Sequence, residues 1–123
     1  MILKNIELKN TTLRILIAKD ILEWKEGLKG SKLDHCDSLL IIFPDNRIAN
    51  ITMIGMREPI DIIWLDEKRQ IQKITEKLEP LREDGTINKV AGVECKYVLE
   101  IQSGKVKNLS LLLGEKLAMF PKL

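Results

Sequence analysis

The segment MREPIDIIWLD, residues 56–66, places one carboxylate inside an apolar run that has the length and composition of a β-strand. Because side chains alternate along a strand, Asp61 shares a face with Ile63 and Leu65. An ionised carboxylate in such surroundings is costly unless it is hydrogen-bonded or paired, and it otherwise becomes protonated or lies at a rim. Asp61 is therefore the leading site candidate of the chain.

Further strand-like segments lie on both sides of this run. The apolar run SLLIIF, residues 38–43, is followed by Pro-Asp-Asn, which predicts a buried strand that ends there. Alternating or β-branched residues predict an N-terminal hairpin of residues 6–8 and 13–17, and further strands at 48–53, 60–65, 71–78, 96–101 and 116–120. Polar loops are expected at 31–38 and 79–89.

Two short helices complete the expected fold. Asp20 and Glu23 have capping-box spacing, which predicts a helix over 21–28 with Ile21, Trp24 and Leu28 on one face. Apolar spacing predicts a second helix over 105–113. The expected fold is mainly β (α+β): a small, curled, antiparallel sheet or barrel with two short helices, formed as a single domain by residues 1–123.

Composition excludes several classes of partner. A net charge of +2 and an aromatic content of 4% disfavour nucleic acid, because neither a strong positive field nor a stacking surface is present. No run approaches a membrane span and no export signal is visible, so we expect a cytoplasmic protein without a membrane partner. The abundance of Ile, Lys and Glu is typical of heat-adapted organisms.

The chain carries no motif for a metal or cofactor. Cys36 and Cys95 are far apart and lack C-x-x-C spacing, so two reduced, packed thiols are expected, with a disulfide between them as the alternative. His35 is the only histidine, and a polar loop explains it better than a metal site does. The glycines do not form a phosphate-binding loop. We therefore predict neither a metal nor a cofactor.

Several short segments carry a family resemblance in the expected order. They are Gly-Leu-Lys at 27–29, SLLIIF at 38–43, PIDIIWLD at 59–66, YVLEI at 97–101 with Gly104, and Leu-Gly-Glu at 113–115. Together they resemble the domain of unknown function 192 family of small bacterial and archaeal proteins. The resemblance implies a compact β-rich fold and no established activity. Where the family usually has FWMKNT, this chain has ITMIGM at 51–56, which keeps the methionine and loses the polar groups.

These features favour a binding module, for a small ligand or a protein, at the surface around residues 53–61. The predicted ligand-binding residues are Met53, Met56, Arg57, Asp61, Trp64 and Glu100. No catalytic residue is assigned, and whether the chain is an enzyme stays open, with a non-enzyme favoured. One alternative is an enzyme with Asp61 and Glu100 as general acid and base. Another is a structural homo-oligomer, for which a homodimer would be the expected assembly.

Each candidate also has a purely structural explanation. Asp61 could accept hydrogen bonds from the turn at 55–58 or pair with Arg57, and so fix the start of its strand. Glu100 could simply lie exposed on the outer face of its strand. Met53 and Met56 could fill the core rather than line an adaptable pocket. The structural explanation is favoured for all four residues.

Overall fold

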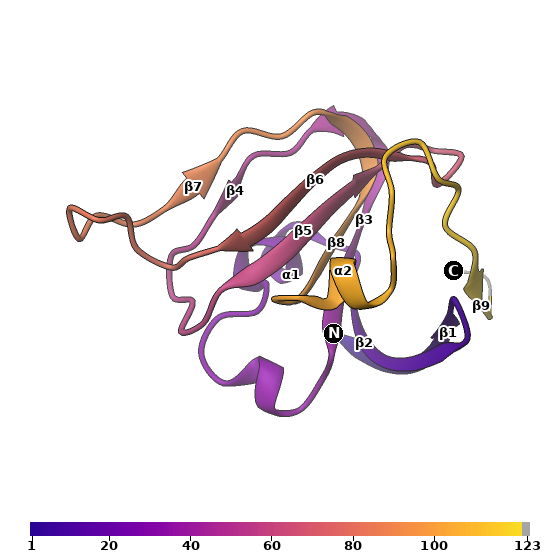
Figure 1. Cartoon of the computed structure of the whole chain (residues 1–123), viewed down its shortest axis with the longest axis horizontal. Helices are drawn as coiled ribbons and strands as arrows, with labels where there is room; N and C mark the ends of the chain where they lie inside the picture. Colours follow the sequence, from indigo (N-terminus) through magenta and orange to yellow (C-terminus); the bar gives the residue numbers. More distant parts are fainter. Residues whose placement is uncertain (122–123) are drawn as a thin grey trace.

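Seven strands form one curled sheet in the order β6-β5-β8-β3-β2-β1-β9 (Figure 1). The structure is a computed structural model and describes residues 1–121. The strands are β1 Ile2–Leu8, β2 Thr11–Ala18, β3 Ser38–Ile48, β5 Ile60–Leu65, β6 Ile71–Leu78, β8 Glu94–Gln102 and β9 Met119–Phe120. A second, two-stranded sheet pairs β4 Ile51–Thr52 with β7 Lys89–Val90. The helices are α1 Ile21–Glu26, the 3-10 turn η1 Lys32–Asp34, and α2 Lys105–Asn108.

The predicted mainly β fold with two short helices is confirmed, with two refinements. The sheet is mixed, because β2 and β3 run parallel across the connection that contains α1 and η1. It is also not closed into a barrel, since β6 and β9 are its two edges. Residues 114–117 lie beside residues 69–71 at the start of β6, where Leu117 N–H donates to Arg69 O at 2.9 Å, before the chain continues into β9 beside β1.

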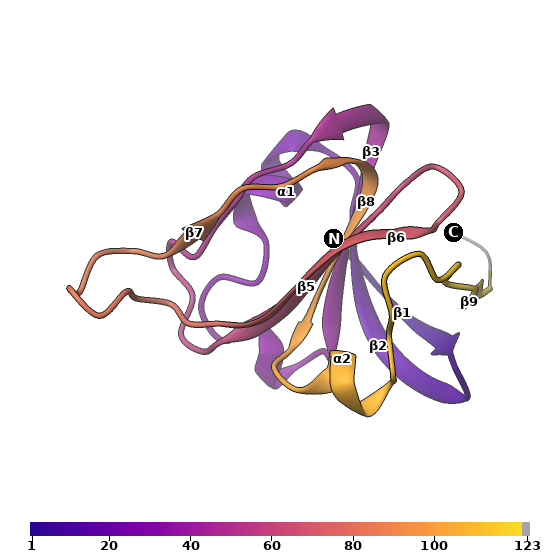
Figure 2. The same ribbon diagram turned by 45° about the horizontal axis from the view of Figure 1, so that its top comes forward.

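Apolar side chains fill both faces of the central strands. On one face, Leu40, Leu99 and Ile101 belong to a first core that extends to α2 through Val106. On the other face lies a second core, which includes Leu39, Ile62 and Val98 and against which Trp24 of α1 packs. Figure 2 shows α1 and α2 on opposite sides of these strands. The strands shared by both cores are therefore apolar on both faces, as their continuous apolar sequences require.

The predicted end of a strand at Pro44 is wrong. Strand β3 continues to Ile48, and the register with β8 changes between Ile42, which faces Tyr97, and Arg47, which faces Cys95. The extra residues form a bulge, where proline's missing N–H costs no ladder hydrogen bond. The strand predicted over 48–53 is consequently reduced to the two residues of β4.

Both helices begin near their predicted positions but are shorter than expected. The Asp20 side chain accepts from Glu23 N–H at 2.9 Å, which confirms the predicted N-cap, and α1 ends at Gly27 with φ of 52°. Of the three residues on the predicted face, Trp24 and Leu28 pack in the second core, whereas Ile21 is 57% exposed. Helix α2 ends at Asn108 rather than 113, because Ser110 adopts φ of 52° in the left-handed region.

The predicted loop at 79–89 is an arm that extends from the body of the molecule between β6 and β7 (Figure 1). Leu81 pairs with Ile87 across it, and Arg82 N–H donates to Thr86 O at 2.8 Å. The two cysteines are buried and unpaired, so the alternative of a disulfide is not realised. Neither helix within residues 1–121 has the length and apolar character needed to cross a bilayer.

Candidate functional site

Asp61 is fully buried and holds three backbone segments together. Its carboxylate accepts hydrogen bonds from Lys77 N–H at 2.8 Å, and from Gly104 N–H and Val106 N–H at 3.0 Å each. These donors belong to the end of β6 and to the turn that opens α2. The prediction that Asp61 bonds to the turn at 55–58 or pairs with Arg57 is therefore wrong. The carboxylate does fix the backbone, but at the end of β6 and the start of α2. All these contacts satisfy Asp61 within the fold.

Glu100 lies on the opposite face of the sheet from Asp61. In the antiparallel pairing of β5 with β8, Asp61 faces Ile101 and Ile62 faces Glu100. Because alternate side chains point to opposite faces, the two carboxylates belong to different cores and cannot act on one substrate. The alternative of an acid-base pair is wrong. The expectation of an exposed Glu100 is also wrong, because the residue is only 6% exposed.

A cavity of about 580 Å³ opens beside the second core and includes Glu100 in its lining. Its walls come from α1 and the residues that follow it, from β3 with its bulge, and from the β4 region. The lining residues are Trp24, Lys25, Glu26, Gly27, Leu28, Lys29, Ile41, Phe43, Arg47, Ile48, Ala49, Asn50, Ile51, Thr52, Ile54, Met56 and Glu100. Most of these side chains are apolar, and Glu100 is the buried ionisable group among them.

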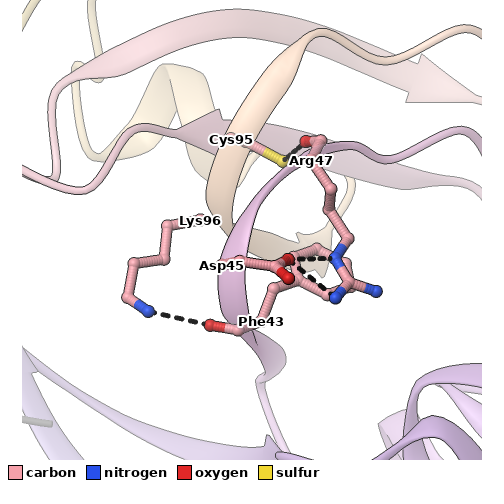
Figure 3. Close-up of polar contacts among 5 residues, drawn as sticks. All are labelled: Phe43, Asp45, Arg47, Cys95 and Lys96. Carbon is pink, nitrogen blue, oxygen red and sulfur yellow. Dashed lines mark hydrogen bonds and ion pairs between the residues drawn. The ribbon is translucent and has the colours of Figure 1, made fainter.

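One wall of the cavity is an aromatic pair covered by a guanidinium group. Trp24 and Phe43 meet edge to face, with their ring centroids 4.8 Å apart. The Arg47 guanidinium lies 5.0 Å from the Trp24 centroid and 4.9 Å from the Phe43 centroid, within cation–π range. Asp45 accepts from Arg47 Nη2 at 2.7 Å and Nε at 2.9 Å (Figure 3). The cation is therefore already neutralised by its own strand.

The β3 bulge holds this wall in place through contacts with β8. Lys96 Nζ donates to Phe43 O at 2.9 Å, and Cys95 Sγ donates to Arg47 O at 3.4 Å (Figure 3). Phe43 lies where the regular ladder is interrupted and Arg47 where it resumes, so side chains of β8 bind carbonyl groups at both ends of the bulge. The irregularity at Pro44 thus creates the wall instead of ending the strand.

Two buried polar groups of the cavity have no protein partner. Within residues 1–121, no donor or cation contacts the Glu100 carboxyl, and the Trp24 Nε1–H has no acceptor. Burial raises the pKa of Glu100 to about 7 from an ordinary value of 4.5, with no neighbouring charge contributing. Near neutral pH the carboxyl group therefore exchanges between its protonated and ionised forms, and it can both donate and accept.

The predicted site residues are divided between different places. Met56 borders the cavity and also a second hollow of about 500 Å³, which Met53 and Arg57 line as well. Met53 is itself a buried member of the second core. Trp64 is fully buried and donates from Nε1 to Ala49 O at 2.8 Å, which gives it a structural role. Within residues 1–121, no three His, Cys, Asp or Glu side chains gather as metal ligands would.

Sequence reasoning missed the aromatic wall and a glycine behind it. Trp24 and Phe43 are two of only five aromatic residues, a scarcity that could have drawn attention to them. Gly92 could not have been recognised from the sequence. A Cβ atom there would overlap the Ala49 carbonyl group and lie 2.7 Å from Trp64 Nε1. Gly92 therefore permits the close approach of two chain segments that support the cavity.

Comparisons with known proteins give a fold and a family without an activity. A crystal structure of a protein of unknown function from Novosphingobium aromaticivorans is 19% identical, with a TM-score of 0.76 over 94% of this chain and 84% of that one. Another, described as a "putative transcription regulator" from Sinorhizobium meliloti, is 22% identical, with a TM-score of 0.79 over 96% of this chain and 94% of that one. At such identities the likeness shows the fold alone. No curated protein matches the sequence.

The family resemblance noted in the sequence is confirmed over nearly the whole chain. The sequence profile of an uncharacterised family matches residues 4–119, and this range includes every strand of the two sheets apart from the ends of β1 and β9. The chain therefore belongs to the domain of unknown function 192 family (DUF192, "Uncharacterized ACR").

Proposed function

We propose that the protein is a binding module that takes a small organic ligand in the cavity beside α1. The observation that carries this proposal is the Glu100 carboxyl group, which is 6% exposed and has no partner within residues 1–121. A buried, unpartnered carboxyl group destabilises a fold, so its presence calls for a compensating contact. A ligand that reaches Glu100 would supply that contact.

The form of the cavity supports the proposal. Its volume of about 580 Å³ is in the range of small-molecule sites, which are mainly apolar and contain a few polar groups that orient the ligand. Glu100 and the Trp24 indole are two such groups, and Phe43 and Ile41 provide apolar surface. The cavity differs from the surface around 53–61 that the sequence suggested, although both include Met56.

The test is a thermal-shift screen of a fragment library against three proteins. Thr52 is exposed and lines the cavity, so the larger side chain of Thr52→Trp should occupy part of it and obstruct a ligand. Thr12 is an exposed threonine of β2 outside the cavity, and Thr12→Trp serves as the matched control. We expect fragments that raise the melting temperature of the wild type and of Thr12→Trp but not of Thr52→Trp.

The screen can also contradict the proposal. If no fragment stabilises the wild type, or if every stabilising fragment acts equally on Thr52→Trp, the cavity is not a binding site. Fragments that change the backbone amide chemical shifts of Met53, Arg57 and Leu81 would instead indicate binding in the second hollow.

We further propose that the protein works in a reducing compartment such as the cytoplasm. Cys36 and Cys95 are both unpaired thiols in the second core, as is usual for proteins of reducing compartments. Fractionation of the source cells, followed by detection of the native protein, would test this location.

A further inference from the structure

We infer that the ligand of this cavity carries a protonated amine that pairs with Glu100, next to an apolar body that packs on the aromatic wall. This inference rests on the proposed function, because it concerns the same cavity. It adds the chemical class of the ligand, a small amphipathic amine. The supporting features are the unpartnered carboxyl group, the charges around the cavity and the unpartnered indole.

The charges around the cavity leave Glu100 without a cation. Lys25, Lys29 and Arg47 also line the cavity, but none of them forms an ion pair with Glu100 or contributes to its pKa. Arg47 is bound to Asp45, and both lysines are exposed. A ligand cation would therefore be the first positive charge to reach the carboxylate, and it would offset the cost of burying that charge.

A ligand anion would meet the opposite situation. It would place a second negative charge beside a carboxylate that is already largely buried, which raises the free energy of both groups. A neutral hydroxyl group could hydrogen-bond to Glu100, but such bonds are about half as strong as those between opposite charges. The cavity should therefore prefer an amine to an alcohol, and an alcohol to a carboxylate, when their apolar parts are equal.

The Trp24 indole adds a second requirement. The Trp24 side chain lines the cavity, and its Nε1–H is buried and has no acceptor within residues 1–121. A hydroxyl, ether or carbonyl oxygen on the same ligand could accept this hydrogen bond. The indole is also a reporter, because the chain has only one other tryptophan, Trp64, whose Nε1–H is already bonded to Ala49 O.

The test compares three probes of one chain length: n-hexylamine, n-hexanol and hexanoate. Each is titrated at pH 8, where Glu100 is mostly ionised, while amide and indole cross-peaks are followed by ¹H–¹⁵N NMR. We expect n-hexylamine to bind about tenfold more tightly than n-hexanol, and hexanoate to bind most weakly. The Trp24 indole signal should move on binding, while the Trp64 signal should stay in place.

Two variants separate the role of Glu100 from general charge effects. Glu100→Gln should abolish the preference for the amine over the alcohol, because the carboxylate is gone. Glu83→Gln removes an exposed carboxylate outside the cavity, and it should keep the preference. If Glu100→Gln does not fold, the three probes with wild-type protein still decide between the outcomes.

Three results would overturn the inference. One is equal affinity of the wild type for all three probes, which would leave ligand binding in the cavity intact and refute only the ligand class. Another is an amine preference that survives in Glu100→Gln. The last is no binding of n-hexylamine at all, in which case the fragment screen decides separately whether the cavity binds ligands of another class.

Discussion

Two carboxylates on neighbouring strands are buried with opposite consequences. Asp61 of β5 accepts three backbone hydrogen bonds, whereas Glu100 of β8 has no partner within residues 1–121. A carboxylate that is satisfied by the fold contributes to stability, and one that is left unsatisfied destabilises the fold but is available to a ligand. Replacing the two carboxylates should therefore have opposite effects on stability at neutral pH.

Replacing Glu100 by glutamine should remove a pH-dependent loss of stability. Since burial raises its pKa from 4.5 to about 7, the folded state holds the proton more tightly than the unfolded state does. The free energy of unfolding should therefore fall as the pH rises from about 4.5 to about 7, by at most about 3 kcal/mol. Urea denaturation of wild type and Glu100→Gln between pH 4 and pH 8 measures the difference.

Glu83→Gln is the control for this comparison, because Glu83 is exposed and its replacement should leave the pH profile of the wild type unchanged. A constant difference in unfolding free energy between wild type and Glu100→Gln over the whole range would contradict the raised pKa.

Replacing Asp61 by asparagine should destabilise the protein at neutral pH. The carboxylate uses both oxygens, and an amide group would turn one acceptor into a donor that faces a backbone N–H. We expect a loss of about 3 kcal/mol, measured by urea denaturation. Asp84→Asn is the matched control, since Asp84 is exposed and accepts from Thr86 in a turn, and it should cost less than about 1 kcal/mol. Equal losses would show that Asp61 does not fix the backbone.

At the scale of elements, the cavity depends on the contact between residue 92, before β8, and the end of β3. Gly92→Ala should lower stability by more than about 3 kcal/mol, because the added methyl group would displace the Ala49 carbonyl and break its hydrogen bond from Trp64. Gly30→Ala is the comparison. Gly30 has φ of 68°, and no atom lies within 4 Å of an added Cβ, so only about 1 kcal/mol of backbone strain is expected. Thermal denaturation of both variants tests the order, and the reverse order would contradict the close approach.

The elements also show what the sequence could and could not reveal. Strands β5 and β8 were predictable, because their apolar runs fix both type and approximate length. The bulge in β3 was not, because Pro44 ends a strand unless a neighbour such as β8 supplies other contacts. The burial of Glu100 was hidden for a similar reason. Alternation assigns it to a face, but only the fold shows that α1 and the β4 region close over that face.

At the scale of the whole molecule, one sheet separates two cores. Leu39 and Leu40 are adjacent in β3, yet the first belongs to the core beside α1 and the second to the core beside α2. Both cores pack on the backbone of β3, β5 and β8. Loss of packing in one core would therefore disturb the strand hydrogen bonds on which the other core also depends. We therefore expect the two cores to unfold in one cooperative transition.

Leu40→Ala tests this cooperativity, because both tryptophans lie on the side of the other core. The substitution should cost about 2–5 kcal/mol. It should lower the urea midpoint equally by tryptophan fluorescence, which reports the core beside α1, and by far-ultraviolet circular dichroism, which reports the whole sheet. Leu22→Ala is the control, since Leu22 is 76% exposed and should change stability by less than about 0.5 kcal/mol. If Leu40→Ala shifted the dichroism transition and left the fluorescence transition in place, the core beside α2 would unfold on its own, and the cavity would be held by the other core alone.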